Sequence, residues 1–193
     1  LEINQKRRLI RPGDAVLDLG CAPGSWLQVA SEIVGPRGVV VGIDLTPVDH
    51  PFPEHVRVLR GDVFTTPPEE YARAAGRRPR GGGGGKGGPP GVFDVVLSDM
   101  APSTSGHGDD LLSVRLCLRV LEVLPGLLRP GGAVCMKVLE GSGAPELIAE
   151  AKRQFVECGT TKPAASRAVS REMFIVGVGY TPRGATPRAD PRL

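Results

Sequence analysis

The stretch Ala15-Val-Leu-Asp-Leu-Gly20-Cys-Ala-Pro-Gly-Ser-Trp26 decides the fold of this 193-residue chain. Its apolar run from Ala15 to Leu19 has the length of a buried strand, and the glycines and proline that follow predict a tight turn. An amphipathic segment from Trp26 to Val34 predicts a helix. Strand, glycine loop and helix in this order are typical of an α/β sheet that binds a nucleotide-like ligand beyond its first strand.

The spacing of the loop argues against a dinucleotide site. Asp18, Gly20 and Gly24 are spaced differently from G-x-G-x-x-G, and Pro23 lies between the two glycines, so a pyrophosphate cradle is not favoured. An acid at a strand end followed by two spaced glycines fits the methionine part and ribose of S-adenosylmethionine. A tight strand-to-helix turn that binds no ligand remains the alternative at this point.

Two further predicted strands lead into an acid. Val39 to Ile43 leads into Asp44, and Val56 to Arg60 leads through a glycine into Asp62. A carboxylate at Asp44 can accept both hydroxyls of a ribose, and one at Asp62 can accept a hydrogen bond from an adenine amino group. Because parallel strands end at one edge of a sheet, these acids predict an adenosine site there. A nicotinamide-dependent oxidoreductase would share Asp44, but the loop spacing and Asp62 disfavour it.

A fourth and a fifth predicted strand add a reactive pair. The fourth covers 92–98 and runs into Asp99, which we expect to face the transferable group of the ligand. The fifth covers 133–138 and contains Lys137. Burial of an ammonium group is costly unless it is paired, so Lys137 requires an acidic partner.

The rest of the chain completes one α/β domain. Further helices are predicted over 1–10, 65–76, 109–128 and 145–155, and further strands over 155–158 and 173–178. Asp109 or Asp110 is expected to cap the third of these helices, and Pro130-Gly131-Gly132 to end it. We expect the domain to span residues 1–180, with a flexible Gly/Pro/Arg-rich insertion at 77–91 and a disordered tail at 181–193.

Composition narrows the class of protein without identifying it. The hydrophobic fraction of 40% and the charged fraction of 23% are ordinary, and a net charge of +3 only weakly favours an anionic partner. The four cysteines lack metal-ligand spacing, so we expect reduced thiols and no metal. We found neither a membrane-spanning run nor a signal peptide, which predicts an intracellular protein without a membrane partner.

Taken together in order, these motifs resemble the FtsJ-like (RrmJ-type) ribosomal RNA 2′-O-ribose methyltransferases. The resemblance rests on the Asp18–Trp26 loop, Asp44, Asp62, Ser98-Asp99-Met-Ala-Pro102, Lys137 and Ser170-Arg171-Glu172. It covers 1–178 outside the insertion. The family implies a Rossmann-like S-adenosylmethionine-dependent methyltransferase fold, with a seven-stranded, mostly parallel sheet and an antiparallel last strand. It also implies a monomer that methylates a uridine of large-subunit ribosomal RNA, free or in the large ribosomal subunit.

The resemblance also assigns residues to roles. The implied cofactor contacts are Gly20, Pro23, Gly24, Trp26, Asp44, Asp62 and Asp99. The implied catalytic residues are Asp99, Lys137 and Glu172, three members of the family's Lys-Asp-Lys-Glu set. The first lysine of that set precedes the segment matching Leu1, and Lys6 is not in its position. We expect that lysine in sequence upstream of Leu1, and the alternative is a version impaired by its loss.

Basic residues that can flank the cleft and hold RNA phosphates are Lys6, Arg7, Arg8, Lys162, Arg167 and Arg171. Two alternative functions remain open: ribose methylation of transfer RNA, and a noncatalytic RNA-binding ribosome assembly factor with the same fold. The expected compartment is the cytoplasm in a bacterium, or a mitochondrion or plastid in a eukaryote.

Overall fold

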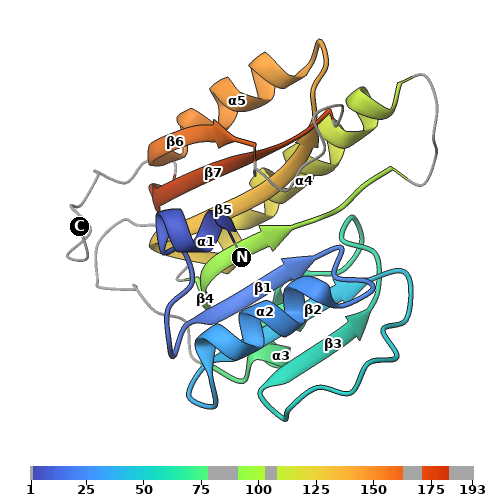
Figure 1. Cartoon of the computed structure of the whole chain (residues 1–193), viewed down its shortest axis with the longest axis vertical. Helices are drawn as coiled ribbons and strands as arrows, with labels where there is room; N and C mark the ends of the chain where they lie inside the picture. The colour runs from blue at the N-terminus through green and yellow to red at the C-terminus, as the bar shows by residue number, and fades with distance from the viewer. Residues whose placement is uncertain (1, 78–90, 103–107, 163–170, 183–193) are drawn as a thin grey trace.

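The structure is a computed structural model that describes residues 2–77, 91–102, 108–162 and 171–182. It contains one seven-stranded sheet covered by helices on both faces (Figure 1). The helices are α1 (Glu2–Arg7), α2 (Ser25–Val34), α3 (Pro68–Ala75), α4 (Asp109–Leu127) and α5 (Ala144–Lys152). The strands are β1 (Ala15–Leu19), β2 (Val39–Asp44), β3 (Val56–Arg60), β4 (Phe93–Ser98), β5 (Leu128–Leu139), β6 (Phe155–Thr161) and β7 (Glu172–Tyr180).

The strand order is β3-β2-β1-β4-β5-β7-β6. Strands β1 to β5 pair in parallel, while β7 pairs antiparallel with both β5 and β6. This topology confirms the predicted fold class. Two layers of buried apolar side chains follow from it: α3, α4 and α5 pack on one face of the sheet, and α2 with the segment after α1 packs on the other.

The central strands begin and end where the apolar runs do. All five residues of β1 are buried, and Val39 to Ile43 of β2 are buried as well, because helices cover both faces of these strands. Leu17 and Leu19 contribute to the layer under α4, whereas Val16 contributes to the layer under α2. The carboxyl ends of β1 to β4 therefore meet at one edge, as the sequence predicts.

The start of β5 differs from the prediction. Helix α4 ends at Leu127, and β5 begins at Leu128 rather than at Ala133. Leu128 pairs with Phe93 across an irregularity in the ladder, which draws the Pro-Gly-Gly segment into the strand. Gly132 is needed there because a Cβ would lie 2.9 Å from the carbonyl oxygen of Asp94. The glycines thus allow a close strand contact and do not end the helix.

Three helix ends were also predicted wrongly. Gly108, with a φ of 97°, takes the N-cap position of α4 with no side-chain cap, so Asp109 and Asp110 lie inside the first turn. Helix α1 ends at Arg7 because Arg8 adopts a left-handed φ of 49°. Helix α5 ends at Lys152, before the predicted residue 155. Residues 78–90 of the expected insertion and 183–193 of the expected tail lie outside the described residues.

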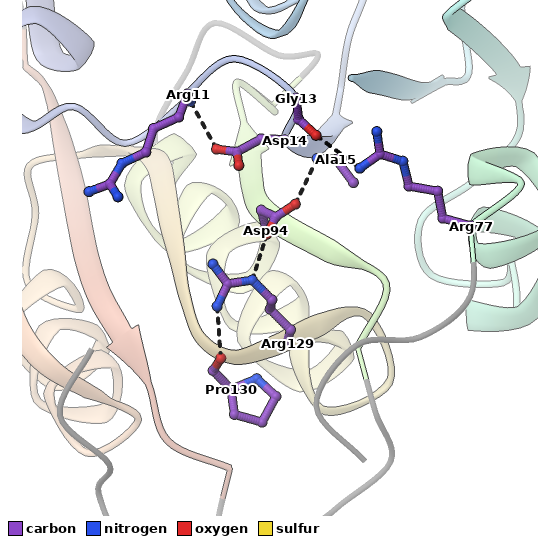
Figure 2. A network of polar contacts seen from close by, with 8 residues as sticks. All are labelled: Arg11, Gly13, Asp14, Ala15, Arg77, Asp94, Arg129 and Pro130. Carbon is purple, nitrogen blue, oxygen red and sulfur yellow. Dashed lines mark hydrogen bonds and ion pairs between the residues drawn. The ribbon is translucent and has the colours of Figure 1, made fainter. Parts of the chain in front are cut away.

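A polar network fastens the opposite edge of the sheet, where β1 and β4 begin (Figure 2). Asp94 accepts hydrogen bonds from the Ala15 N–H at 2.8 Å and from Arg129 Nε at 2.6 Å. Arg77 donates to the carbonyl of Gly13 at 3.0 Å. Since Asp94 is only 3% exposed, these contacts join β1, β4 and β5 away from solvent.

The cysteines are reduced, and the described helices are unlike membrane spans. All four cysteines are free thiols, and burial raises the pKa of Cys21, Cys117 and Cys135 to about 12, so these thiols are neutral. Within the described ranges, no helix has both the length and the apolar character needed to cross a membrane.

Candidate active site

A cavity of about 480 Å³ lies at the carboxyl ends of β1 to β4. Its lining includes four of the predicted cofactor residues: Gly20, Asp44, Asp62 and Asp99. They come from four different strand ends, and the sheet brings them together across 80 residues of sequence. A cavity of this size can enclose a small ligand such as a nucleoside.

Backbone hydrogen bonds hold two of these acids in place. Asp44 accepts from the N–H of Ala22 at 2.9 Å and from the N–H of Thr46 at 2.8 Å. Asp62 accepts from the N–H of Phe64 at 2.9 Å. A carboxylate has about four lone-pair sites, so both acids retain acceptor capacity toward the cavity. The donor set therefore suits the hydroxyl and amino groups of an adenosine.

Gly20 is required by both conformation and space. Its φ of +78° lies in the left-handed region, and a Cβ would lie 2.5 Å from Cγ of Met100 and 2.9 Å from its Cα. The loop after β1 is thus pressed against the segment after β4. This contact shapes the wall of the cavity and leaves the backbone accessible to a ligand.

Asp18 lies within β1, two residues before Gly20, and is fully buried. Neither of its carboxylate oxygens has a hydrogen-bond partner among the described residues. Desolvation, followed by the negative charges of Asp99 and Asp44, raises its pKa from 3.8 to about 7. Burial of such a group without a partner lowers the stability of the fold, and a positive charge nearby would offset that cost.

Lys137 contacts two acids, Asp99 at the cavity wall and Glu172 of β7. Its Nζ is 2.7 Å from Oδ1 of Asp99 and 3.6 Å from Oε1 of Glu172. Glu172 is the first residue of β7, and the antiparallel register sets it opposite Leu139, two residues after Lys137. The Lys137 side chain is 14% exposed and that of Asp99 35% exposed, so the amine is shielded from water on one side and the carboxylate remains accessible from the cavity. The three predicted catalytic residues therefore form one cluster at the cavity.

Three predicted cofactor residues are not among the residues that line this cavity. Pro23 is exposed, and Gly24 lies against Val48 and Phe52, whose side chains a Cβ would approach to 3.1 Å. Trp26 stacks on Phe174 with ring centroids 5.8 Å apart and an interplanar angle of 28°. This places the tryptophan on the face of the sheet covered by α2.

The predicted RNA-binding residues fall into two groups. Lys162 forms an ion pair with Glu140 at 3.0 Å, and Arg171 donates to the Glu140 carbonyl at 2.6 Å, so both lie just beyond the end of β5. Lys6 of α1 pairs with Glu2 at 2.7 Å, and Arg7 and Arg8 are exposed. Arg167 lies outside the described residues.

The sequence analysis missed the apolar part of the cavity wall. Leu45 follows Asp44, and Phe64 lies two residues after Asp62. The guanidinium groups of Arg115 and Arg119 lie 5.4 and 5.9 Å from the centre of the Phe64 ring. The sequence contained a signal for both residues, since an apolar residue close after a strand-end acid is placed at the same edge of the sheet. In the described part of the chain, no cluster of three His, Cys, Asp or Glu residues could hold a metal ion.

Comparisons with known proteins identify relatives of this chain. A methyltransferase named ribosomal RNA large subunit methyltransferase E from Syntrophobacter fumaroxidans is 46% identical over 179 residues, covering 92% of this chain and 84% of that protein. A protein of the same name from Methanothermobacter thermautotrophicus is 41% identical, covering 92% and 79%.

Solved structures show the same fold. A ribosomal RNA methyltransferase from Plasmodium falciparum superimposes with a TM-score of 0.73 at 26% identity, covering 94% of each chain. Fibrillarin from Aeropyrum pernix, solved with S-adenosylmethionine, shares the fold alone, with a TM-score of 0.59 at 18% identity over 88% of this chain and 68% of that one. The model of the FtsJ-like methyltransferase family matches residues 1–180, and the chain belongs to that family.

Proposed function

We propose that this protein transfers a methyl group from S-adenosylmethionine to a ribose 2′-hydroxyl of large-subunit ribosomal RNA, at a uridine. The observation that carries the proposal is the Lys137 cluster beside a cavity whose wall holds three strand-end acids. Relatives named ribosomal RNA large subunit methyltransferase E support the choice of RNA. We extend the proposal to an intracellular monomer with a single domain over residues 1–180.

The cavity residues have distinct roles in holding the cofactor. Asp44 accepts the ribose hydroxyls, Asp62 accepts the adenine amino group, and Gly20 lets the backbone approach the ligand. Asp99 lies between the cavity and Lys137 and faces the methionine end. When bound, S-adenosylmethionine supplies an activated methyl group. Pro23, Gly24 and Trp26 remain proposed cofactor contacts on the family resemblance alone.

The remaining chemistry belongs to the Lys137 cluster. The protein must hold the ribose hydroxyl in line with the methyl group and accept its proton. Lys137 can accept that proton only as a neutral amine, so we propose that binding of RNA displaces one of its acidic partners. Asp99 positions the amine, and Glu172 is the partner with the longer contact, at 3.6 Å. Lys6, Arg7, Arg8, Lys162 and Arg171, together with Arg167, hold the RNA phosphates.

Methyl transfer tests this proposal directly. Labelled S-adenosylmethionine is incubated with unmodified large-subunit RNA, with large ribosomal subunits and with transfer RNA, and the product is mapped for ribose methylation. We expect transfer to the ribosomal substrate and a loss of about 10²- to 10⁴-fold in Lys137→Ala. Lys152→Ala, an exposed lysine on α5, is the matched control and should retain activity.

Two results would contradict the proposal. Transfer to transfer RNA alone would identify the other substrate class. Cofactor binding without transfer to any RNA would favour the noncatalytic assembly factor.

A further inference from the structure

A second cavity, of about 70 Å³, lies on the face of the sheet covered by α1 and α2. Figure 1 shows both helices on the same face of the sheet, with α1 in front of β5 and α2 in front of β1 and β2. The cavity is lined by Ile3, Leu9, Trp26, Val29, Leu97 and Cys135, among others. Its lining includes Trp26, one of the three predicted cofactor residues that do not line the cofactor cavity.

The position of this cavity relative to the catalytic cluster follows from the strands. Cys135 precedes Lys137 by two residues on β5, so both side chains point to the same face, about 7 Å apart along the strand. Leu97 lies near the end of β4, two residues before Asp99. Phe174 is the register partner of Lys137 on β7, and its ring stacks on Trp26. The cavity and the catalytic lysine are therefore neighbours on one face.

The lining is apolar and uncharged. Its one amide, Asn4, is already engaged, since its Oδ1 accepts from the Ile10 N–H at 2.7 Å and its Nδ2 donates to the Ile10 carbonyl at 3.4 Å. The Cys135 thiol is neutral, because burial raises its pKa to about 12. A charged phosphate would lose its hydration here without gaining partners. A flat, uncharged ring is the group that this lining suits.

The size of the cavity sets a limit on that ring. A water molecule needs about 10–15 Å³ of cavity volume. A cavity of about 70 Å³ therefore has room for several waters, and the space they would fill is comparable to that of one pyrimidine ring. Proteins that read single-stranded RNA commonly hold splayed bases against aromatic side chains, and Trp26 is half-buried at this cavity. We infer that the cavity binds the pyrimidine base of the nucleotide whose ribose lies at Lys137. This inference rests on the proposed function and names a subsite for its substrate.

The sole tryptophan of the chain provides a readout that is independent of catalysis. A uridine tetranucleotide is titrated into the protein while Trp26 fluorescence is followed, with an abasic ribose-phosphate tetranucleotide as the parallel probe and S-adenosylmethionine alone as a third. We expect quenching by the uridine oligonucleotide and none by the abasic one. Equal responses to both oligonucleotides, or no response to either, would overturn the inference. The response to S-adenosylmethionine alone is the baseline, because Trp26 is also a proposed cofactor contact.

Two substitutions on α2 test whether the oligonucleotide base binds in this cavity. Val29→Phe fills the cavity, whereas Gln28→Phe adds the same ring to an exposed position one residue away. We expect Val29→Phe to weaken the uridine oligonucleotide about tenfold, the scale of one base stack, and to raise the KM for RNA while the affinity for S-adenosylmethionine and the melting temperature stay unchanged. Gln28→Phe should change none of these.

A folded Val29→Phe protein with unchanged oligonucleotide affinity would overturn the inference. Quenching by uridine without methyl transfer by the wild type would instead retain the subsite and refute the proposed reaction.

Discussion

Asp94 and Asp18 are buried carboxylates on neighbouring strands, and they differ in whether the chain provides hydrogen-bond partners for their oxygens. Asp94 is 3% exposed and accepts from Ala15 and Arg129 at the edge where the strands begin (Figure 2). Asp18 is fully buried toward the edge where the strands end, and its oxygens have no partner in the described structure. The acid that joins the strands is satisfied within the chain, whereas the acid two residues before Gly20 of the cavity wall is not, although it does not itself line the cavity.

The largest expected effect is on the satisfied acid. Asp94→Ala leaves Arg129 and the Ala15 N–H without their partner, and loss of one member of a buried pair costs about 3–5 kcal/mol. Urea unfolding of the empty protein measures this loss. Asp94→Asn is the control, because its amide oxygen still accepts from Ala15 and its smaller loss isolates the charge. A cost under about 1 kcal/mol for Asp94→Ala would remove the contrast between the two acids.

Asp18→Asn should act in the opposite direction. With a pKa of about 7 in the folded state against 3.8, wild-type Asp18 binds more protons folded than unfolded, so stability falls as pH rises from about 4 to about 7. The shift corresponds to up to about 4 kcal/mol, from which an unsatisfied amide subtracts about 1–3 kcal/mol. We therefore expect the variant to be more stable than wild type above pH 7, with the difference shrinking toward pH 4. Unfolding free energies measured across that range would refute this if the difference did not depend on pH.

Gly20→Ala tests the close contact between Gly20 and Met100 at the cavity wall. The new methyl group must displace Met100, and the backbone must keep a φ of +78°, so we expect a loss of about 1–3 kcal/mol and weaker S-adenosylmethionine binding by calorimetry. Gly13→Ala is the matched control, since Gly13 has a φ of +85° but nothing within 4 Å of its Cβ position. The two variants share the backbone strain, and their difference reports the contact. Equal losses would mean that Met100 moves freely.

The smallest expected effect on stability concerns exposed charges. Replacing Lys6, Arg7 and Arg8 of the α1 region with glutamine removes one surface ion pair, Lys6 with Glu2, which contributes about 0–1 kcal/mol. If these residues hold phosphates, the salt dependence of RNA binding should decrease by about one per lost contact. Filter binding across a salt series measures this slope. An unchanged slope would remove these residues from the RNA site.

Sequence alone predicted the elements whose boundaries are local. The apolar runs of β1 and β2 fix their own ends, since a glycine or an acid follows each run directly. The start of β5 could not be read this way. Its Pro-Gly-Gly segment joins the strand because of contacts with β4 and Asp94, which are distant in sequence.

The same distinction holds for the site. Asp44, Asp62 and Asp99 were predicted because each ends a strand, and the topology of parallel strands places such residues at one edge. The positions of Trp26 and Met100 depend on how a loop packs against a distant segment. Trp26 meets Phe174 of β7, which lies 148 residues later in the chain. No local pattern in the glycine loop indicates that contact.

The antiparallel strand β7 has a consequence for the synthesis of this protein. Because β7 runs against its neighbours, its first residue, Glu172, lies beside Lys137 at the end of β5, and its pairing with β5 extends to Val178. The strands that line the cavity come from the first hundred or so residues, whereas β7 is the last strand of the domain to leave the ribosome. The cluster of Lys137, Asp99 and Glu172 therefore cannot be complete until synthesis has passed β7.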